Sequence, residues 1–131
     1  MRSGVAILLA LASLVCAAEK KAKPAKSPDV RVVEIRCQRT EDRVTVDGRV
    51  RIGGNRTLER FTLFFDFLDS RAQVITTRRN DYGEEILSPG QDVDFNLYLP
   101  DPVRAVHVVV RAESKDGREL RVANPGPYPI F

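Results

Sequence analysis

The sequence is poor in the side chains that carry most protein chemistry. It has one histidine, two cysteines, one methionine and no tryptophan in 131 residues. Zinc and catalytic sites usually combine several histidines, cysteines or carboxylates, and His107 stands alone in an alternating apolar stretch. The sequence also lacks a GxSxG motif and a phosphate-binding glycine loop. We therefore predict a protein that is not an enzyme and that holds no cofactor and no metal.

A histidine-poor chain can still bind calcium through carboxylate oxygens. Asp92 and Asp94 alternate on one predicted strand, and Asp101 follows it. Calcium takes about six to eight oxygen ligands, usually from a structured loop. Because the sequence shows no such loop, we interpret these carboxylates as solvated side chains.

The two cysteines stand in different kinds of sequence. Cys16 belongs to an apolar N-terminal stretch, whereas Cys37 lies in a segment where apolar and charged residues alternate. If the N-terminal stretch is removed, Cys37 is the only thiol and no disulfide can form within the chain. An unpaired cysteine in such a pattern is typical of a small buried apolar residue.

The first 18 residues have the pattern of an export signal. Arg2 supplies a positive charge, and residues 5–15 form an apolar run that is too short to span a bilayer. Small residues follow, so we expect cleavage after Ala18 and an exported, periplasmic or extracellular protein. A lipoprotein signal, with Cys16 lipidated and retained, is the alternative. Such signals carry a small residue before the cysteine, and Val15 stands there instead.

A basic segment separates this signal from the rest of the chain. Residues 19–29 contain lysine, alanine and proline without apolar periodicity, which predicts a flexible tether. Residues 1–28 hold five of the 21 basic side chains and one of the 18 acidic ones. Residues 29–131 therefore hold 16 basic and 17 acidic side chains. Since that part is nearly neutral and its charges alternate, we expect no nucleic acid partner. We expect membrane contact only through the basic tether or a lipidated Cys16.

From residue 30 onward the dominant pattern is the period of two that is typical of β-strands. Asp47-Gly48 can form a hairpin turn, but the alternation stays in phase across it, so we favour one continuous strand. The expected strands cover residues 33–37, 44–52, 58–68, 72–79, 93–99, 106–112 and 120–122.

Turn residues separate these strands at regular intervals. They are the segments 53–55, 87–91, 100–102 and 115–118. Seven regularly spaced strands predict an all-β antiparallel sandwich of immunoglobulin-like or fibronectin-III-like form over residues 30–124. The paired cysteines and the core tryptophan of antibody domains are absent. Residues 125–131 form a proline-rich tail in which regular pairing is restricted.

The stretch VDGRVRIGGNRTLERFTLFFDFLDSRAQVI, followed by LSPGQDVDF, resembles the FxLYD-type domain of exported bacterial proteins. Shared features are a glycine-containing strand, an asparagine turn, an aromatic strand ending in aspartate and a Pro-Gly-Gln turn. In this chain Phe61-Thr62-Leu63 is followed by Phe64-Phe65-Asp66. The resemblance covers about residues 30–113 and implies a noncatalytic extracytoplasmic module.

Residues 61–68 contain four phenylalanines and two leucines, so this strand is apolar on both faces. Phe61, Leu63, Phe65 and Phe67 share one face, which we expect to form the core. In an immunoglobulin-like sandwich the third strand neighbours the sixth. The predicted outer patch consists of Phe64, Leu68, Ala105, His107 and Val109.

Exposed apolar patches often mark partner surfaces. One interpretation is that this outer patch binds a partner, most simply another envelope protein. The alternative is that Tyr128, Ile130 and Phe131 of the tail fold back over it. The sequence as a whole predicts a noncatalytic module for protein binding or envelope assembly. A lipid-anchored lipoprotein with an accessory structural role is the second hypothesis.

Overall fold

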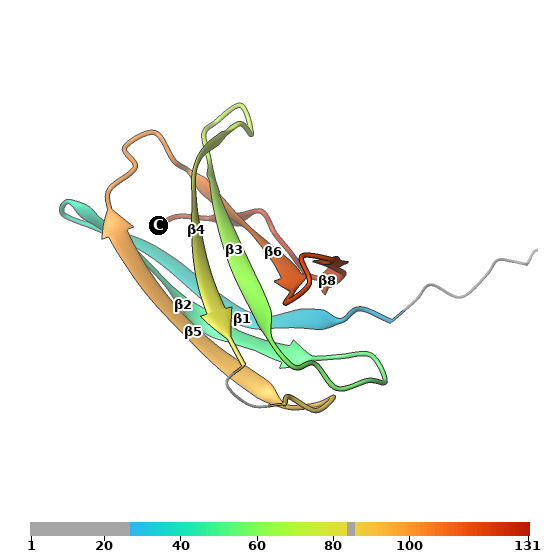
Figure 1. Cartoon of the computed structure of the whole chain (residues 1–131). Coiled ribbons are helices and arrows are strands. Elements are labelled where there is room, and N and C mark those ends of the chain that lie inside the picture. Colours follow the sequence, from blue (N-terminus) through green and yellow to red (C-terminus); the bar gives the residue numbers. More distant parts are fainter. Residues whose placement is uncertain (1–26, 84–85) are drawn as a thin grey trace, which may run out of the picture.

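The computed structural model describes residues 27–83 and 86–131 (Figure 1). The expected signal and residues 19–26 of the expected tether lie outside the described residues. The strands are β1 (Val30–Thr40), β2 (Arg43–Ile52), β3 (Phe61–Leu68), β4 (Val74–Tyr82), β5 (Asp92–Pro100), β6 (His107–Ser114), β7 (Glu119–Leu120), β8 (Val122–Ala123) and β9 (Tyr128–Pro129). Within the described ranges, the chain forms no helix of the length and apolar character needed to cross a membrane.

The strands form two sheets that enclose the core, as predicted for an all-β sandwich (Figure 1). One sheet has the order β5-β2-β1-β8, and the other has the order β4-β3-β6-β7 with β9 also paired to β6. The described residues contain nine strands rather than seven. The expected strand 120–122 is divided, because β7 pairs with β6 while β8 pairs with β1 in the other sheet. The β1–β8 pairing is parallel, so the sandwich is not wholly antiparallel.

Strand β2 runs without a turn through Asp47 and Gly48, which confirms the prediction of one continuous strand instead of a hairpin turn. Gly48 is needed there because β1 and the ring of Phe95 approach its backbone closely. A Cβ atom at Gly48 would lie 2.1 Å from the carbonyl oxygen of Glu34 and 2.8 Å from Cζ of Phe95. The approach coincides with a β-bulge in β1 between Val32 and Glu34.

The core lies between the two sheets, and β3 contributes its largest side chains. Phe61, Leu63, Phe65 and Phe67 are at most 1% exposed, which confirms the predicted inner face. Phe65 meets Phe95 of the opposite sheet with ring centroids 5.2 Å apart. Full burial of each such side chain contributes about 1.5–3 kcal/mol to stability.

Cys37 is buried in the same core, as expected. Its burial, with a smaller effect from the charge of Asp47, raises the pKa of the thiol to about 11. A buried thiol that stays protonated at neutral pH is a poor nucleophile. Cys37 therefore has a structural place in the fold.

The two ends of the described chain belong to the sandwich. Asp29, assigned to the tether from sequence, donates its backbone N–H to the carbonyl of Arg121 and accepts a hydrogen bond from Gly53 N. The tail joins both sheets: Ile130 N bonds to Val106 O, and Phe131 N bonds to Cys37 O. The folded unit therefore extends beyond residues 30–124 at both ends.

Candidate functional site

The outer face of the sheet β4-β3-β6 carries the residues that the sequence singled out. Strand β3 is the middle strand, and it pairs with β6 as predicted. The register places Phe64 between Arg79 of β4 and Arg111 of β6. Two residues further along β3, on the same face, Asp66 lies between Thr77 of β4 and Val109 of β6.

Guanidinium groups from both neighbouring strands lie over the aromatic ring of Phe64. The Cζ atom of Arg111 lies 4.8 Å from the ring centroid, and that of Arg79 lies 5.6 Å from it. A cation within about 6 Å of a ring face is attracted by the ring quadrupole. We call Arg79, Phe64 and Arg111 the Arg-Phe-Arg cluster.

Asp66 holds one member of this cluster, Arg111, in place. Its carboxylate accepts hydrogen bonds from Arg111 Nε at 2.6 Å, from Arg111 Nη2 at 3.1 Å and from Thr77 Oγ1 at 2.7 Å. The residue is only 7% exposed. Burial raises the pKa of Asp66, but the donors of Arg111 and Thr77 lower it by more, so it stays below its ordinary value. Asp66 is therefore a charged anchor that holds Arg111 in place.

The five residues of the predicted outer patch do not form one exposed apolar surface. Phe64, His107 and Val109 lie on the outer face of the sheet and are half-buried. Leu68 is 9% exposed and Ala105 is fully buried. The prediction that Leu68 and Ala105 are exposed on the outer face was therefore wrong.

The chain before β6 explains both errors. Strand β6 begins at His107, so the outward alternation does not extend back to Ala105. Ala105 belongs instead to the loop before β6, and its carbonyl oxygen accepts a hydrogen bond from Arg39 Nη2 at 2.8 Å. Val106 N donates to Leu68 O at 2.8 Å, so this loop lies directly against the end of β3.

The C-terminal tail does not cover the Arg-Phe-Arg cluster. Its strand β9, Tyr128 and Pro129, pairs with Val108 and His107 on the edge of β6 that faces away from β3. Tyr128 and Ile130 pack against the core between the two sheets. Neighbouring arginines rather than the tail are therefore what shields Phe64.

The candidate site predicted from sequence did not include Asp66, Thr77, Arg79 or Arg111. Alternation puts Arg111 on the same face of its strand as Val109, but its contact with Phe64 depends on the register between β3 and β6. An aspartate among phenylalanines was the available signal, because a buried carboxylate needs a charged or hydrogen-bonding partner. Sixteen basic residues after position 28 made that partner impossible to select from spacing alone.

The opposite sheet carries a smaller aromatic–arginine pair. Tyr98 of β5 is exposed, and the Cζ atom of Arg43 lies 4.9 Å from its ring centroid. This pair has no buried carboxylate comparable to Asp66 within the described residues. It offers a matched reference for experiments on Phe64.

The described residues contain no group of three or more histidine, cysteine or carboxylate side chains placed to hold a metal ion. His107 is half-buried on the outer face, opposite Leu68 and out of phase with buried Val108. The arrangement on this face can bind a partner by charge, aromatic contact and hydrogen bonds.

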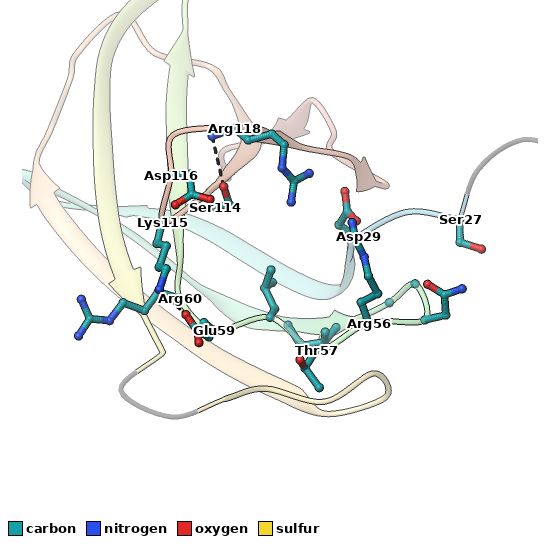
Figure 2. A pocket seen from close by; sticks show the side chains of 15 residues that line it. Ser27, Asp29, Arg56, Thr57, Glu59, Arg60, Ser114, Lys115, Asp116 and Arg118 are labelled. Carbon is teal, nitrogen blue, oxygen red and sulfur yellow. Dashed lines mark hydrogen bonds and ion pairs between the residues drawn. The ribbon is translucent and has the colours of Figure 1, made fainter.

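A separate cleft of about 710 Å³ lies at one end of the sandwich (Figure 2). Its walls are the segment from Gly53 to Arg60 and the turn from Ser114 to Arg118. An ion pair between Lys115 and Glu59 joins the two walls. Figure 2 shows the Arg118 side chain reaching into the cleft on the side where Asp29 lies.

The cleft mixes charges of both signs and contains neither histidine nor cysteine. Its carboxylates are partly engaged, since Glu59 pairs with Lys115 and Asp29 accepts a hydrogen bond from Arg121 N. The cleft is therefore a weaker candidate for specific recognition than the Arg-Phe-Arg cluster, whose charges are held in a defined geometry.

Comparison with known proteins adds little about function. No protein-family model matches the chain, and no curated protein matches its sequence. The resemblance to FxLYD-type domains therefore stays a prediction.

Two solved structures show a limited likeness. A β-glucosidase from Kluyveromyces marxianus is 16% identical with a TM-score of 0.38, over 71% of this chain and 13% of the enzyme. A protein described as ApaA from Bordetella pertussis is 15% identical with a TM-score of 0.42, over 79% of this chain and 100% of that one. The chain thus spans only a small part of the glucosidase. Neither similarity assigns an activity, substrate or partner to this chain.

Proposed function

We propose that the chain is a noncatalytic extracytoplasmic module that binds another protein through the outer face of β4-β3-β6. The observation that carries the proposal is the Arg-Phe-Arg cluster, in which Arg111 is held by Asp66. The N-terminal export pattern in residues 1–18 supports the extracytoplasmic location. The partner proposed is a protein of the same envelope compartment.

The composition of the cluster suits a binding face. Arginine and aromatic residues dominate the energetic centres of protein interfaces. The side chains of Arg79 and Arg111 remain 63% and 42% exposed, so both keep donors for a partner. Since Arg111 is already fixed by Asp66, binding orders one side chain fewer, which favours affinity.

The type of sandwich is part of the proposal. We place it in the immunoglobulin-like and fibronectin-III-like class. Supporting this, β1 and β2 lie in one sheet, β3 and β4 in the other, and β5 and β6 return to pair with β2 and β3. Domains of this architecture frequently serve as cell-surface modules.

The experiment is a comparison of proteins captured from envelope extract by the purified chain and by two variants. Phe64→Ser removes the centre of the proposed face, and Tyr98→Ser removes an exposed aromatic from the opposite sheet. We expect a partner that wild type and Tyr98→Ser capture and Phe64→Ser loses. Equal capture by all three proteins would exclude this face as the binding site.

A further inference from the structure

Strand β4 forms an open edge beside the Arg-Phe-Arg cluster. It pairs with β3 on one side, and no other described strand pairs with its second side. Figure 1 shows β4 as the terminal strand of its sheet. Such an edge presents a row of backbone N–H and C=O groups that another extended chain can pair with.

The side chains along this edge are apolar at one end and basic near the middle. Val74 is 56% exposed and Ile75 is also exposed. Arg78 and Arg79 follow, and Arg79 belongs to the cluster on the outer face. The edge is therefore continuous with the proposed binding face.

Arg78 occupies an unusual position. It lies opposite Phe65 in the register, which is an inner-face position, yet its side chain is exposed because β4 is the last strand. Within the described residues, no carboxylate lies at ion-pairing distance from Arg78. A charge at this place disfavours uncontrolled pairing of the edge.

The same charge opposes pairing between two copies of the chain. An antiparallel β4–β4 pair that overlaps over the whole strand places Arg78 directly opposite Arg78 of the second copy. Like charges directly opposite each other destabilise a strand pair. An incoming strand with acidic side chains meets attraction at the same place.

We propose that β4 accepts an extended acidic segment of the partner protein as an added strand, with its carboxylates beside Arg78. This inference rests on the proposed binding function and specifies how the partner is recognised. Backbone hydrogen bonds to β4 supply affinity, and Arg78 selects for acidic side chains. Strand β5, the terminal strand of the other sheet, has the opposite character, with Asp92, Asp94 and a final Pro100.

The test uses fluorescent nine-residue peptides, matched to the nine residues of β4. The first peptide alternates valine with glutamate. Two others replace every glutamate with glutamine or with lysine. Two further peptides keep the glutamates but are N-methylated on alternate amides, one in each phase, so that each lacks the backbone donors along one edge. Fluorescence anisotropy of each peptide with the purified chain measures binding.

We expect the glutamate peptide to bind, the glutamine peptide to bind more weakly and the lysine peptide not to bind. One of the two N-methylation phases abolishes binding, because an added strand bonds through one edge only. Arg78→Glu weakens binding of the glutamate peptide by at least about tenfold, and Arg78→Gln weakens it less. Arg31→Glu, the same charge change at an exposed side chain of β1, leaves binding within about twofold.

Three results overturn the proposal: equal binding of the lysine peptide, binding that neither N-methylation phase disturbs, and equal effects of Arg78→Glu and Arg31→Glu. Self-association of the purified chain that Arg78→Glu alters and Arg31→Glu does not would make a second copy the occupant instead. If envelope capture depends on Phe64 while these peptide results fail, strand addition is wrong and the binding function stands.

Discussion

Arg111 holds the carboxylate of Asp66 through two hydrogen bonds, 2.6 Å from Nε and 3.1 Å from Nη2, on the outer face of a sheet whose inner face is core. The same guanidinium group lies 4.8 Å from the ring centroid of Phe64. One arginine therefore neutralises a buried charge and covers an outward aromatic ring. This explains how β3 can be apolar on both faces without exposing a bare patch.

Removing Arg111 should destabilise the protein more than removing Arg79. Arg111→Ala leaves a buried carboxylate with one side-chain donor, at an expected cost of about 1–3 kcal/mol. Arg79 pairs with exposed Asp81, and exposed pairs contribute at most about 1 kcal/mol. Urea denaturation of both alanine variants measures the difference. Equal losses would show that Asp66 does not depend on Arg111.

The stability that Asp66 contributes should depend on pH. Its pKa is lower in the folded protein than in the unfolded chain, so its contribution is present above the unfolded value of about 3.9. That contribution is lost as the pH falls through the lower folded value. The difference in unfolding free energy between wild type and Asp66→Asn should therefore shrink on acidification from neutral pH. A difference that stays constant as the pH falls below about 3.9 would show that the pKa of Asp66 is not lowered in the folded protein.

Phe65 should be the most sensitive test of the core. It is fully buried and meets Phe95 across the two sheets. Phe65→Ala should cost about 3–5 kcal/mol through lost transfer free energy and a new cavity. The control is Phe131→Ala, which removes the same side chain from an exposed position. Similar denaturant midpoints for the two variants would show that the strand phase is wrong.

The C-terminal tail should contribute to folding rather than to shielding of Phe64. It bonds to β6 and β1 and packs Tyr128 and Ile130 against the core. Deletion of residues 125–131 should lower the unfolding free energy and increase binding of a hydrophobic dye. A tail-deleted chain with wild-type stability and no added dye binding would contradict this packing.

Most of the fold follows from local pattern. The period of two located six strands and the inner face of β3, because each side-chain position in a strand alternates between faces. Turn residues then fixed the breaks, as at Gly117, whose φ of 83° suits glycine. The last short strands were predicted only in part, with β7 and β8 merged into one strand and β9 not expected, since each has two residues and carries no measurable period.

The candidate site was predicted only in part, because its chemistry depends on pairing between distant strands. Sequence alternation placed Phe64 outward, but the choice of Arg79 and Arg111 as its neighbours requires the registers of β3 with β4 and β6. Ala105 was misplaced for the converse reason. The alternation was extended across a loop, where periodicity no longer determines which way a side chain points.

The export signal remains a prediction with a direct test. The apolar run and Ala18 predict a mature chain that begins at Glu19. Mass spectrometry of the native protein should give that N-terminus or one within a residue of it. An intact Met1 would contradict export by cleavage, and a diacylglyceryl group on Cys16 would select the lipoprotein alternative.

If the outer face of β4-β3-β6 binds the partner, Phe64 contributes more to binding than to folding. The most direct measurement is the affinity of the captured envelope partner for wild type, Phe64→Ser and Tyr98→Ser, with the unfolding free energy of each. Phe64→Ser should lose about 1–2 kcal/mol of stability, from two cation–π contacts of about 0.5–1 kcal/mol each. It should stay folded and bind the partner at least about tenfold more weakly than wild type. Tyr98→Ser should bind the partner as wild type does. Unchanged affinity of folded Phe64→Ser would contradict the account.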